Sequence, residues 1–191
     1  MSKVPRLETE RLILRDWQQS DRSGFATMNA DPLVMEYFPT ALTAEESDAF
    51  VERTIAHWSR GYGHWALEEK SSGKFLGFVG LYSPTWEAHF TPAVEIGWRL
   101  AREGWDRGYA TEAASRVLEW AKANVVLPRG EIVSFTTVGN ARSRRVMEKL
   151  GLHHDEADDF DHPLLPEWEK RRHVLYRLQL QPDGRPPQHD S

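Results

Sequence analysis

The sequence of 191 residues contains no cysteine. This absence excludes disulfide bonds, thiolate metal ligands and a cysteine nucleophile. The sequence also lacks an apolar run that approaches the roughly 20 residues of a membrane-spanning helix. Its first residues, Met1–Pro5, do not have the pattern of a signal peptide. We therefore expect a cytoplasmic protein with no membrane partner.

The chain also lacks a net positive charge: 29 Asp and Glu outnumber 24 Lys and Arg, so the formal net charge is −5 at pH 7. Nonspecific nucleic-acid binding needs a positive field, so we expect no nucleic-acid partner. Apolar residues make up 40% of the chain and include eight tryptophans, enough for a substantial core. We predict one domain over residues 1–180. The last segment, 181–191, holds three prolines and one glycine and is predicted to be a disordered tail.

The hydrophobic pattern predicts an α+β (mixed α/β) protein. A central, largely antiparallel sheet of six to seven strands should be flanked by about four helices. The fourth and fifth strands should be parallel neighbours, because a helix connects them. Strands are expected at 7–15, 64–69, 75–82, 93–100, 131–138 and 173–178, helices at 21–29, 43–61, 111–125 and 140–150, and a long acidic loop at 155–169.

The stretch from Glu95 to Glu112 runs from an apolar strand through a loop with Gly104 and Gly108 into a long amphipathic helix. The first N–H groups of a helix have no partner within the helix, and the helix dipole favours an anion there. The order strand, glycine-bearing loop and helix therefore indicates a site for a phosphorylated ligand. The alternative is that the glycines only shape a tight turn.

Four short blocks resemble the GNAT superfamily of acetyl-CoA-dependent N-acetyltransferases, and in particular its RimJ/RimL-like branch of ribosomal-protein N-terminal acetyltransferases. They occur in the family's order: L-E-T-E-R-L at 7–12, W-D-R-G-Y-A at 105–110, G-Y-A-T-E-A at 108–113, and Asn140 with Ser143 before E-K-L-G at 148–151. The first position of the family's Gln/Arg-x-x-Gly-x-Gly/Ala loop is Trp105 here, which departs from the superfamily pattern but is typical of this branch.

The resemblance implies the GNAT fold and acetyl-CoA as co-substrate, without a metal. The acceptor would be a primary amine, either a small molecule or a protein N-terminus, attacked directly in a ternary complex. Homodimers are common in the family. The resemblance also implies that a backbone N–H of this strand, that of Trp98, stabilises the oxyanion. The positions implied to bind the cofactor are Ile96, Trp98, Leu100, Arg102, Arg107, Gly108, Tyr109, Ala110, Thr111, Asn140, Ser143 and Arg144.

Two side chains are candidates for catalysis. Glu95 lies in an otherwise apolar strand, where its pKa could be raised so that it accepts a proton through water. The alternative is an ion pair with an arginine such as Arg99. Many family members use a tyrosine acid at the position of Met147, so we assign the acid to Ser143. The alternative is that Asn140 is only a helix cap and Ser143 an ordinary first-turn residue.

Other clusters have plainer explanations. Histidines and aspartates between His153 and His162 lack the ligand spacing of a helix or hairpin, so a solvated acidic loop is favoured over a metal site. That loop either attracts a cationic amine or only aids solubility. Arg102 and Arg107 either meet phosphates or remain solvated. A different functional class, a non-catalytic acyl-CoA-binding sensor or regulatory module, is distinguished from an enzyme by CoA release with a panel of amines.

Overall fold

The computed structural model describes residues 4–181, which form two compact units. The first unit contains the chain up to Leu81 together with Gly97–Val117. The second contains Tyr82–Ile96 together with the chain from Leu118 onward. Strand β5 (Glu95–Leu100) and helix α3 (Tyr109–Asn124) each run from one unit into the other.

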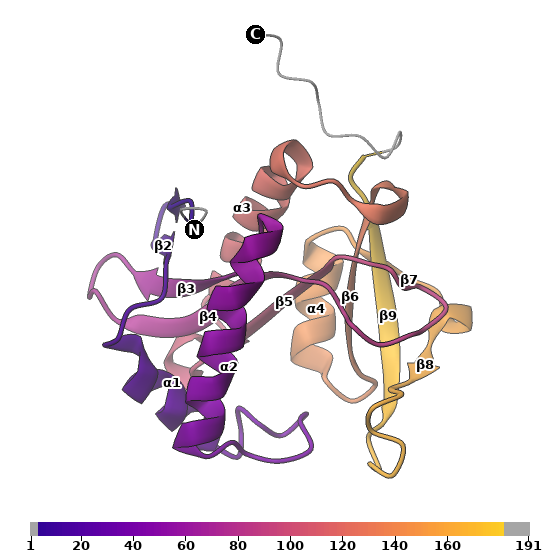
Figure 1. Ribbon diagram of the computed structural model, residues 1–191, viewed down its shortest axis with the longest axis horizontal. Helices are drawn as coiled ribbons and strands as arrows, with labels where there is room; N and C mark the ends of the chain where they lie inside the picture. The colour runs from indigo at the N-terminus through magenta and orange to yellow at the C-terminus, as the bar shows by residue number, and fades with distance from the viewer. Residues whose placement is uncertain (1–3, 182–191) are drawn as a thin grey trace, which may run out of the picture. The chain divides into compact units, whose positions relative to one another are not determined.

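In the first unit, four strands follow one another as antiparallel neighbours, and the second part of β5 comes next to β4. Helix α2 crosses in front of β3 and β4 (Figure 1). The unit also holds the first half of α3. Its other elements are β1 (Leu7–Glu8), β2 (Leu12–Arg15), α1 (Asp21–Ala30), α2 (Ala44–His57), η1 (Trp58–Arg60), β3 (His64–Glu69), β4 (Phe75–Tyr82, of which Tyr82 belongs to the second unit) and η2 (Arg102–Gly104).

Local sequence signals explain most of this unit. Thr43 caps α2 in a full capping box with Glu46, as the sequence predicts. Gly61 ends the following 3-10 turn in the left-handed region at φ 88°. The predicted hairpin of β3 and β4 is confirmed. The core of the first unit packs aromatic and aliphatic side chains from helices and strands together, among them Trp17, Phe25, Val51, Ala66 and Phe78.

The start of the chain differs from the prediction of one strand over 7–15. The chain folds back on itself, so that Leu7 pairs with Leu14 across two short antiparallel strands. A turn at Thr9 makes this possible, because the Thr9 N–H donates to the carbonyl of Leu12 (3.0 Å). The sequence predicts Ser20 or Asp21 as the N-cap of α1, and this prediction is wrong. Ser20 makes no side-chain cap, and Asp21 accepts from Arg15 instead.

In the second unit, the first part of β5 is parallel to β6, with Glu95 opposite Val133, which confirms the predicted parallel pair. β6 is antiparallel to β9, and β9 also pairs with β7 and β8. The core gathers Phe90, Val133, Phe160 and Leu175. The elements of this unit, besides the second half of α3, are β6 (Glu131–Thr137), α4 (Ala141–Lys149), β7 (His153–His154), β8 (Phe160–Asp161), β9 (Arg172–Gln179), η3 (Pro128–Gly130) and η4 (Glu156–Asp158).

The predicted fold class is confirmed: helices accompany a mostly antiparallel arrangement of strands. Residues 4–181 contain nine strands rather than six to seven, because β1, β7 and β8 have two residues each, too short for a periodic pattern. The predicted loop 155–169 contains η4 and β8. In the predicted tail, Gln181 is buried and bonded, and the rest lies outside the described residues. No helix in the described part is long and apolar enough to span a membrane.

Candidate active site

Glu95 is the first residue of β5 and has a desolvated carboxyl. Burial raises the pKa of Glu95 to about 8, from an ordinary value near 4.5. The alternative of an ion pair with Arg99 receives no support, because the Arg99 guanidinium donates to Asn29 Oδ1 (2.7 Å). A carboxyl with this pKa is partly ionised near neutral pH and can accept a proton from an amine or a water.

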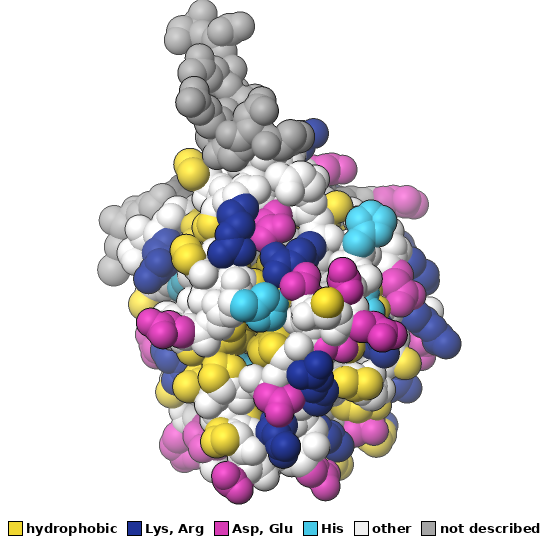
Figure 2. All heavy atoms as spheres, turned by 90° about the vertical axis from the view of Figure 1, so that its right-hand side faces the viewer, with side chains coloured by type: hydrophobic (Ala, Val, Ile, Leu, Met, Phe, Trp, Pro, Cys, Tyr) yellow, Lys and Arg dark blue, Asp and Glu magenta, His cyan; other side chains and the backbone are white. Residues whose placement is uncertain are grey.

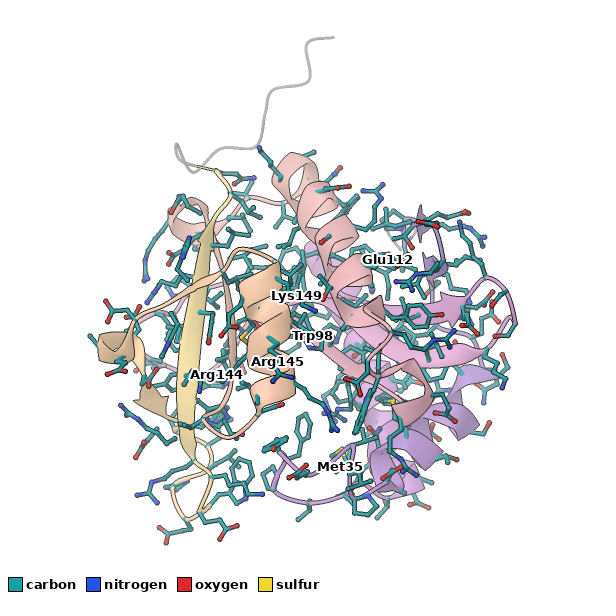
Figure 3. All side chains as sticks on the ribbon, turned by 180° about the vertical axis from the view of Figure 1, so that it is seen from behind. Met35, Trp98, Glu112, Arg144, Arg145 and Lys149 are labelled. Atoms are coloured by element: carbon teal, nitrogen blue, oxygen red, sulfur yellow. The ribbon has the colours of Figure 1, made fainter. Side chains whose placement is uncertain are left out.

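The rest of β5 contains three predicted cofactor positions. Ile96 is fully buried, and its carbonyl accepts from the Ser134 hydroxyl (2.8 Å) of the neighbouring strand. Trp98 is partly exposed and projects from β5 (Figure 3). The carbonyl of Leu100 accepts from the indole of Trp105 (2.8 Å). Trp105 therefore closes the end of the strand, a structural role that explains a large indole in place of a polar residue.

Gly108 sets the start of α3. It has φ 77°, in the left-handed region where a side chain is strained, and it immediately precedes the first helical residue, Tyr109. Glycine has no side chain with which to cap the helix. The Glu112 N–H donates to the Gly108 carbonyl (3.0 Å), whereas the N–H groups of Ala110 and Thr111 precede the first such helical bond. These donors suit an anion.

Tyr109 and Arg107 are tied to a strand of the same unit. The Tyr109 hydroxyl donates to Glu69 Oε1 (2.5 Å), and Arg107 Nη1 lies 3.0 Å from the same oxygen. The guanidinium groups of Arg11 and Arg107 lie 4.6 Å and 4.7 Å from the centre of the Tyr109 ring. Hydrogen bonds from Ser72 and Tyr109 lower the pKa of Glu69, which keeps it ionised. No local sequence pattern indicates Glu69 as the partner of this loop.

Arg102 is engaged with α1. Its Nε donates to Asp31 Oδ2 (2.7 Å). Both residues line a groove of about 580 Å³ that α1, the start of β4 and the Arg102–Gly104 turn surround. This carboxylate partner makes Arg102 a weaker phosphate ligand than the sequence suggested. The Arg102 side chain remains more than half exposed.

Glu112 connects two of the sequence blocks on which the resemblance rests. Its carboxylate accepts from the Thr9 hydroxyl (2.5 Å), the Arg11 N–H (3.0 Å) and Arg11 Nε (2.7 Å). The block at 7–12 is therefore folded onto the first turn of α3. This contact gives a physical reason why the two motifs occur together.

The predicted residues of α4 lie at its first turn. Asn140 is the N-cap, and its Oδ1 accepts from the Ser143 N–H (3.2 Å), while its amide donates to Thr136 (2.9 Å). The Ser143 side chain is partly exposed. Arg144 donates to the Tyr176 hydroxyl and the Val138 carbonyl (3.2 Å each), which turns it towards β9. Arg144, Arg145 and Lys149 all project from α4 (Figure 3). Met147 is fully buried.

Two carboxylates of the acidic loop pair with arginines. Asp158 accepts from Arg177 Nε (2.6 Å), and Asp161 from Arg171 Nε (3.0 Å). His154 Nε2 lies 2.7 Å from Asp159 Oδ1. Acidic and basic side chains are interspersed over the face that Figure 2 shows. No group of three or more His, Asp or Glu side chains within the described residues could hold a metal ion.

Comparisons with known proteins identify the class. The family model described as an acetyltransferase (GNAT) domain matches residues 11–153. The uncharacterized protein YkkB of Bacillus subtilis (strain 168) is 31% identical over 159 residues, which cover 82% of this chain and 90% of that protein. The crystal structure of an acetyltransferase from Agrobacterium tumefaciens str. C58 matches with a TM-score of 0.74 and 26% identity, over 93% of this chain and 96% of that one.

The chain therefore belongs to the GNAT acetyltransferase family. It is an acetyltransferase enzyme, and this excludes the alternative of a non-catalytic acyl-CoA-binding module. GNAT acetyltransferases use acetyl-CoA. A more distant structure is RimL, a ribosomal L7/L12 α-N-protein acetyltransferase in complex with coenzyme A. It matches with a TM-score of 0.72 over 94% of this chain and 100% of that one, but at 13% identity the likeness concerns the fold alone.

Proposed function

We propose that this enzyme transfers the acetyl group of acetyl-CoA to a primary amine by direct attack, with both substrates bound together. The observation that carries the proposal is the Glu95 carboxyl on the partly buried start of β5, where desolvation raises its pKa to about 8, a value that suits a base working near neutral pH. The amine nitrogen attacks the thioester carbonyl, the C–N bond forms and the C–S bond breaks. The amine proton leaves through water to Glu95, and CoA departs as thiolate or thiol.

The donor is held mainly by backbone groups in this proposal. The N–H groups over Arg107–Thr111 meet the pyrophosphate of the donor, and Gly108 leaves room for close approach. Arg107 adds positive charge from the same loop, although its guanidinium also pairs with the Glu69 carboxylate. Ile96, Trp98 and Leu100 accompany the pantetheine arm along β5. Arg102 contributes less, because Asp31 already pairs with it.

The chemistry on the thioester is divided between two groups. The Trp98 N–H stabilises the oxyanion that forms when the amine attacks, a role whose loss typically costs about 10²–10³ in rate. Ser143 donates a hydrogen bond to the sulfur or protonates it as it leaves. Buried Met147 offers no hydroxyl for this step. Asn140 positions Ser143 by accepting its N–H, and it supports donor binding at the same turn together with Arg144.

The finer assignment to the RimJ/RimL-like branch is supported by the sequence blocks and by the bonds from Thr9 and Arg11 to Glu112 that join two of them. Under this proposal the acceptor is a protein N-terminus or a small amine. An α-amino group has a pKa near 8, so roughly a tenth is neutral at pH 7, and a single carboxylate base suffices. A homodimer that works in the cytoplasm, as one domain, completes the proposal.

The test is CoA release from acetyl-CoA with a panel of amines: peptides, polyamines, amino acids and aminoglycosides. Turnover with at least one class is expected, and mass spectrometry of the product should locate the acetyl group on nitrogen. Glu95→Gln and Ser143→Ala then test the roles. If neither variant lowers kcat/KM by more than about threefold, a change of only ~0.6 kcal/mol, the acid–base assignment is wrong.

A further inference from the structure

Two arginines of the first unit are largely enclosed, and they differ in what surrounds them. Arg15 donates from Nη1 and Nη2 to the two oxygens of Asp21 (2.7 and 2.8 Å) and from Nε to Glu68 (2.6 Å). These bonds raise the pKa of Arg15. Arg15 is therefore neutralised within the fold, which is the usual arrangement for an enclosed charge.

Arg99 has no such partner. Its one hydrogen bond within residues 4–181 runs from Nη1 to the neutral amide oxygen of Asn29 (2.7 Å). Its Nε is buried and bonds to nothing in this part of the chain. Asn29 is itself buried and held by Ser47 (2.9 Å), so the amide is fixed in place. Among the described residues, no carboxylate lies within ion-pair distance of the Arg99 guanidinium, although the residue stays partly exposed.

The groups that face Arg99 are neutral. Its guanidinium carbon lies 4.0 Å from the centre of the Phe38 ring, and 5.5 Å and 5.7 Å from those of Phe50 and Phe78. His64 also belongs to this cluster, and burial lowers its pKa to about 3, so it carries no charge near neutral pH. Aromatic faces stabilise a cation, but they use none of its N–H donors. Within residues 4–181 the Nη2 group makes no hydrogen bond and is not among the buried atoms, so it can still donate to a ligand.

We infer that Arg99 binds a carboxylate of the acceptor, so that the preferred substrate is an amine that also bears a free carboxylate. This rests on the proposed function and narrows its acceptor class. Nη2 can donate to a carboxylate oxygen in a charge-assisted hydrogen bond, and the positive charge of the guanidinium favours an anion beside it. Phe38 lies on the segment between α1 and α2, and it is 37% exposed, so a ligand can reach the ring against which Arg99 packs. A polyamine, which is purely cationic, would be repelled by Arg99.

The first experiment compares matched acceptors at saturating acetyl-CoA. Glycine, β-alanine, 4-aminobutyrate and lysine are each assayed beside the corresponding amide, which keeps the amine and removes the negative charge. The expected kcat/KM for the best acid exceeds that for its amide by about 10- to 100-fold, the range for a hydrogen bond to a charged group. Equal or better use of the amides, of peptide N-termini or of polyamines overturns the inference.

The second experiment removes the charge. Arg99→Met is expected to raise KM for the acid by about 10- to 100-fold while KM for the amide stays within about twofold. Arg99→Lys should retain part of the preference. Arg22→Met is the control, because it removes another partly buried arginine of the first unit, one that pairs with Asp48 and Glu52 of α2, and it should leave the ratio unchanged. A fall in kcat that is equal for acid and amide would show that Arg99 only supports the fold, and this outcome contradicts the inference.

The two proposals fail in different ways. Release of CoA with amines that shows no preference for acids refutes the carboxylate site alone. Absence of turnover with every amine refutes the proposed function, and the carboxylate site is then tested by calorimetric titration of the acids and amides in the presence of CoA. Binding of an acid that Arg99→Lys weakens supports the site, and failure of every acid to bind overturns it. If Arg99→Met does not fold, the wild-type ratio and Arg99→Lys decide.

Discussion

Glu95 and Glu112 are the same residue type at the two ends of one stretch, and their pKa values shift in opposite directions. Burial raises the pKa of Glu95 to about 8. Burial also acts to raise the pKa of Glu112, but hydrogen bonds from Thr9 and Arg11 outweigh it and lower that pKa. The difference shows that donors decide whether an enclosed carboxylate serves as a proton acceptor or as a structural anchor.

The largest effect is expected from Glu95→Gln, which removes the base and keeps the shape. We expect kcat/KM to fall by about 10²–10⁴. Wild-type kcat/KM should rise with pH up to about 8, because Glu95 must lose its proton, and the variant should lose this limb. The measurement is a pH–rate profile with two acceptors whose amines differ in pKa.

The control for this comparison is Glu52→Gln, which removes an exposed carboxylate from α2. Its profile should match the wild type. A wild-type limb that moves with the acceptor's amine pKa, rather than staying near the pKa of Glu95, would contradict the role of Glu95 as base.

The second effect is on stability. Between about pH 6.5 and 8 the folded state keeps the Glu95 proton that the unfolded state has released. The free energy of unfolding therefore falls as pH rises, by up to about 1.4 kcal/mol per pH unit. Glu95→Gln should flatten this slope in urea unfolding at several pH values. Below pH 6.5 the trend reverses, because buried histidines such as His64 resist protonation. An unchanged slope in the variant would show that Glu95 is not desolvated.

The third effect concerns the anchor. Glu112→Gln keeps the volume of the side chain but weakens three hydrogen bonds, so we expect a loss of about 1–2 kcal/mol in the free energy of unfolding. The estimate is low because the Arg11 side chain is 44% exposed and solvent screens the pair. The loss should also vanish when the pH falls below the pKa of Glu112, since its lowered pKa contributes stability only above that point. A double-mutant cycle with Arg11→Met measures the coupling.

The smallest effect tests whether a polar group with a structural role can also serve the donor. Asn140→Ala removes the cap of α4 and should cost about 1 kcal/mol, and Asn140→Asp should restore most of it. Thr43→Ala, at the cap of α2, is the matched control. Acetyl-CoA affinity that falls in Asn140→Ala but not in Thr43→Ala supports a second role for Asn140. Equal affinity in both leaves it as a cap alone.

Sequence reasoning succeeded where short-range rules decide the structure. The Thr43 capping box, the β3–β4 hairpin and the Asn140 cap follow from neighbouring residues. It failed where a distant partner decides. The first strand breaks at Thr9 because the chain turns there and bonds to Glu112, a hundred residues away. The sequence indicates Arg99 only as an ion-pair partner for Glu95, because no local pattern marks Asn29 as the residue to which Arg99 donates.

Gln181 has a practical consequence for how far the chain can be shortened. Its side-chain amide donates to the carbonyls of Lys122 and Val125 (3.0 and 2.9 Å), at the end of α3, and its backbone N–H donates to Gly130 (2.9 Å). One residue near the C-terminus thus closes the end of a helix that began some seventy positions earlier. A shortened version of the chain should therefore keep Gln181, because ending at Leu180 would remove the donor that these carbonyls now share.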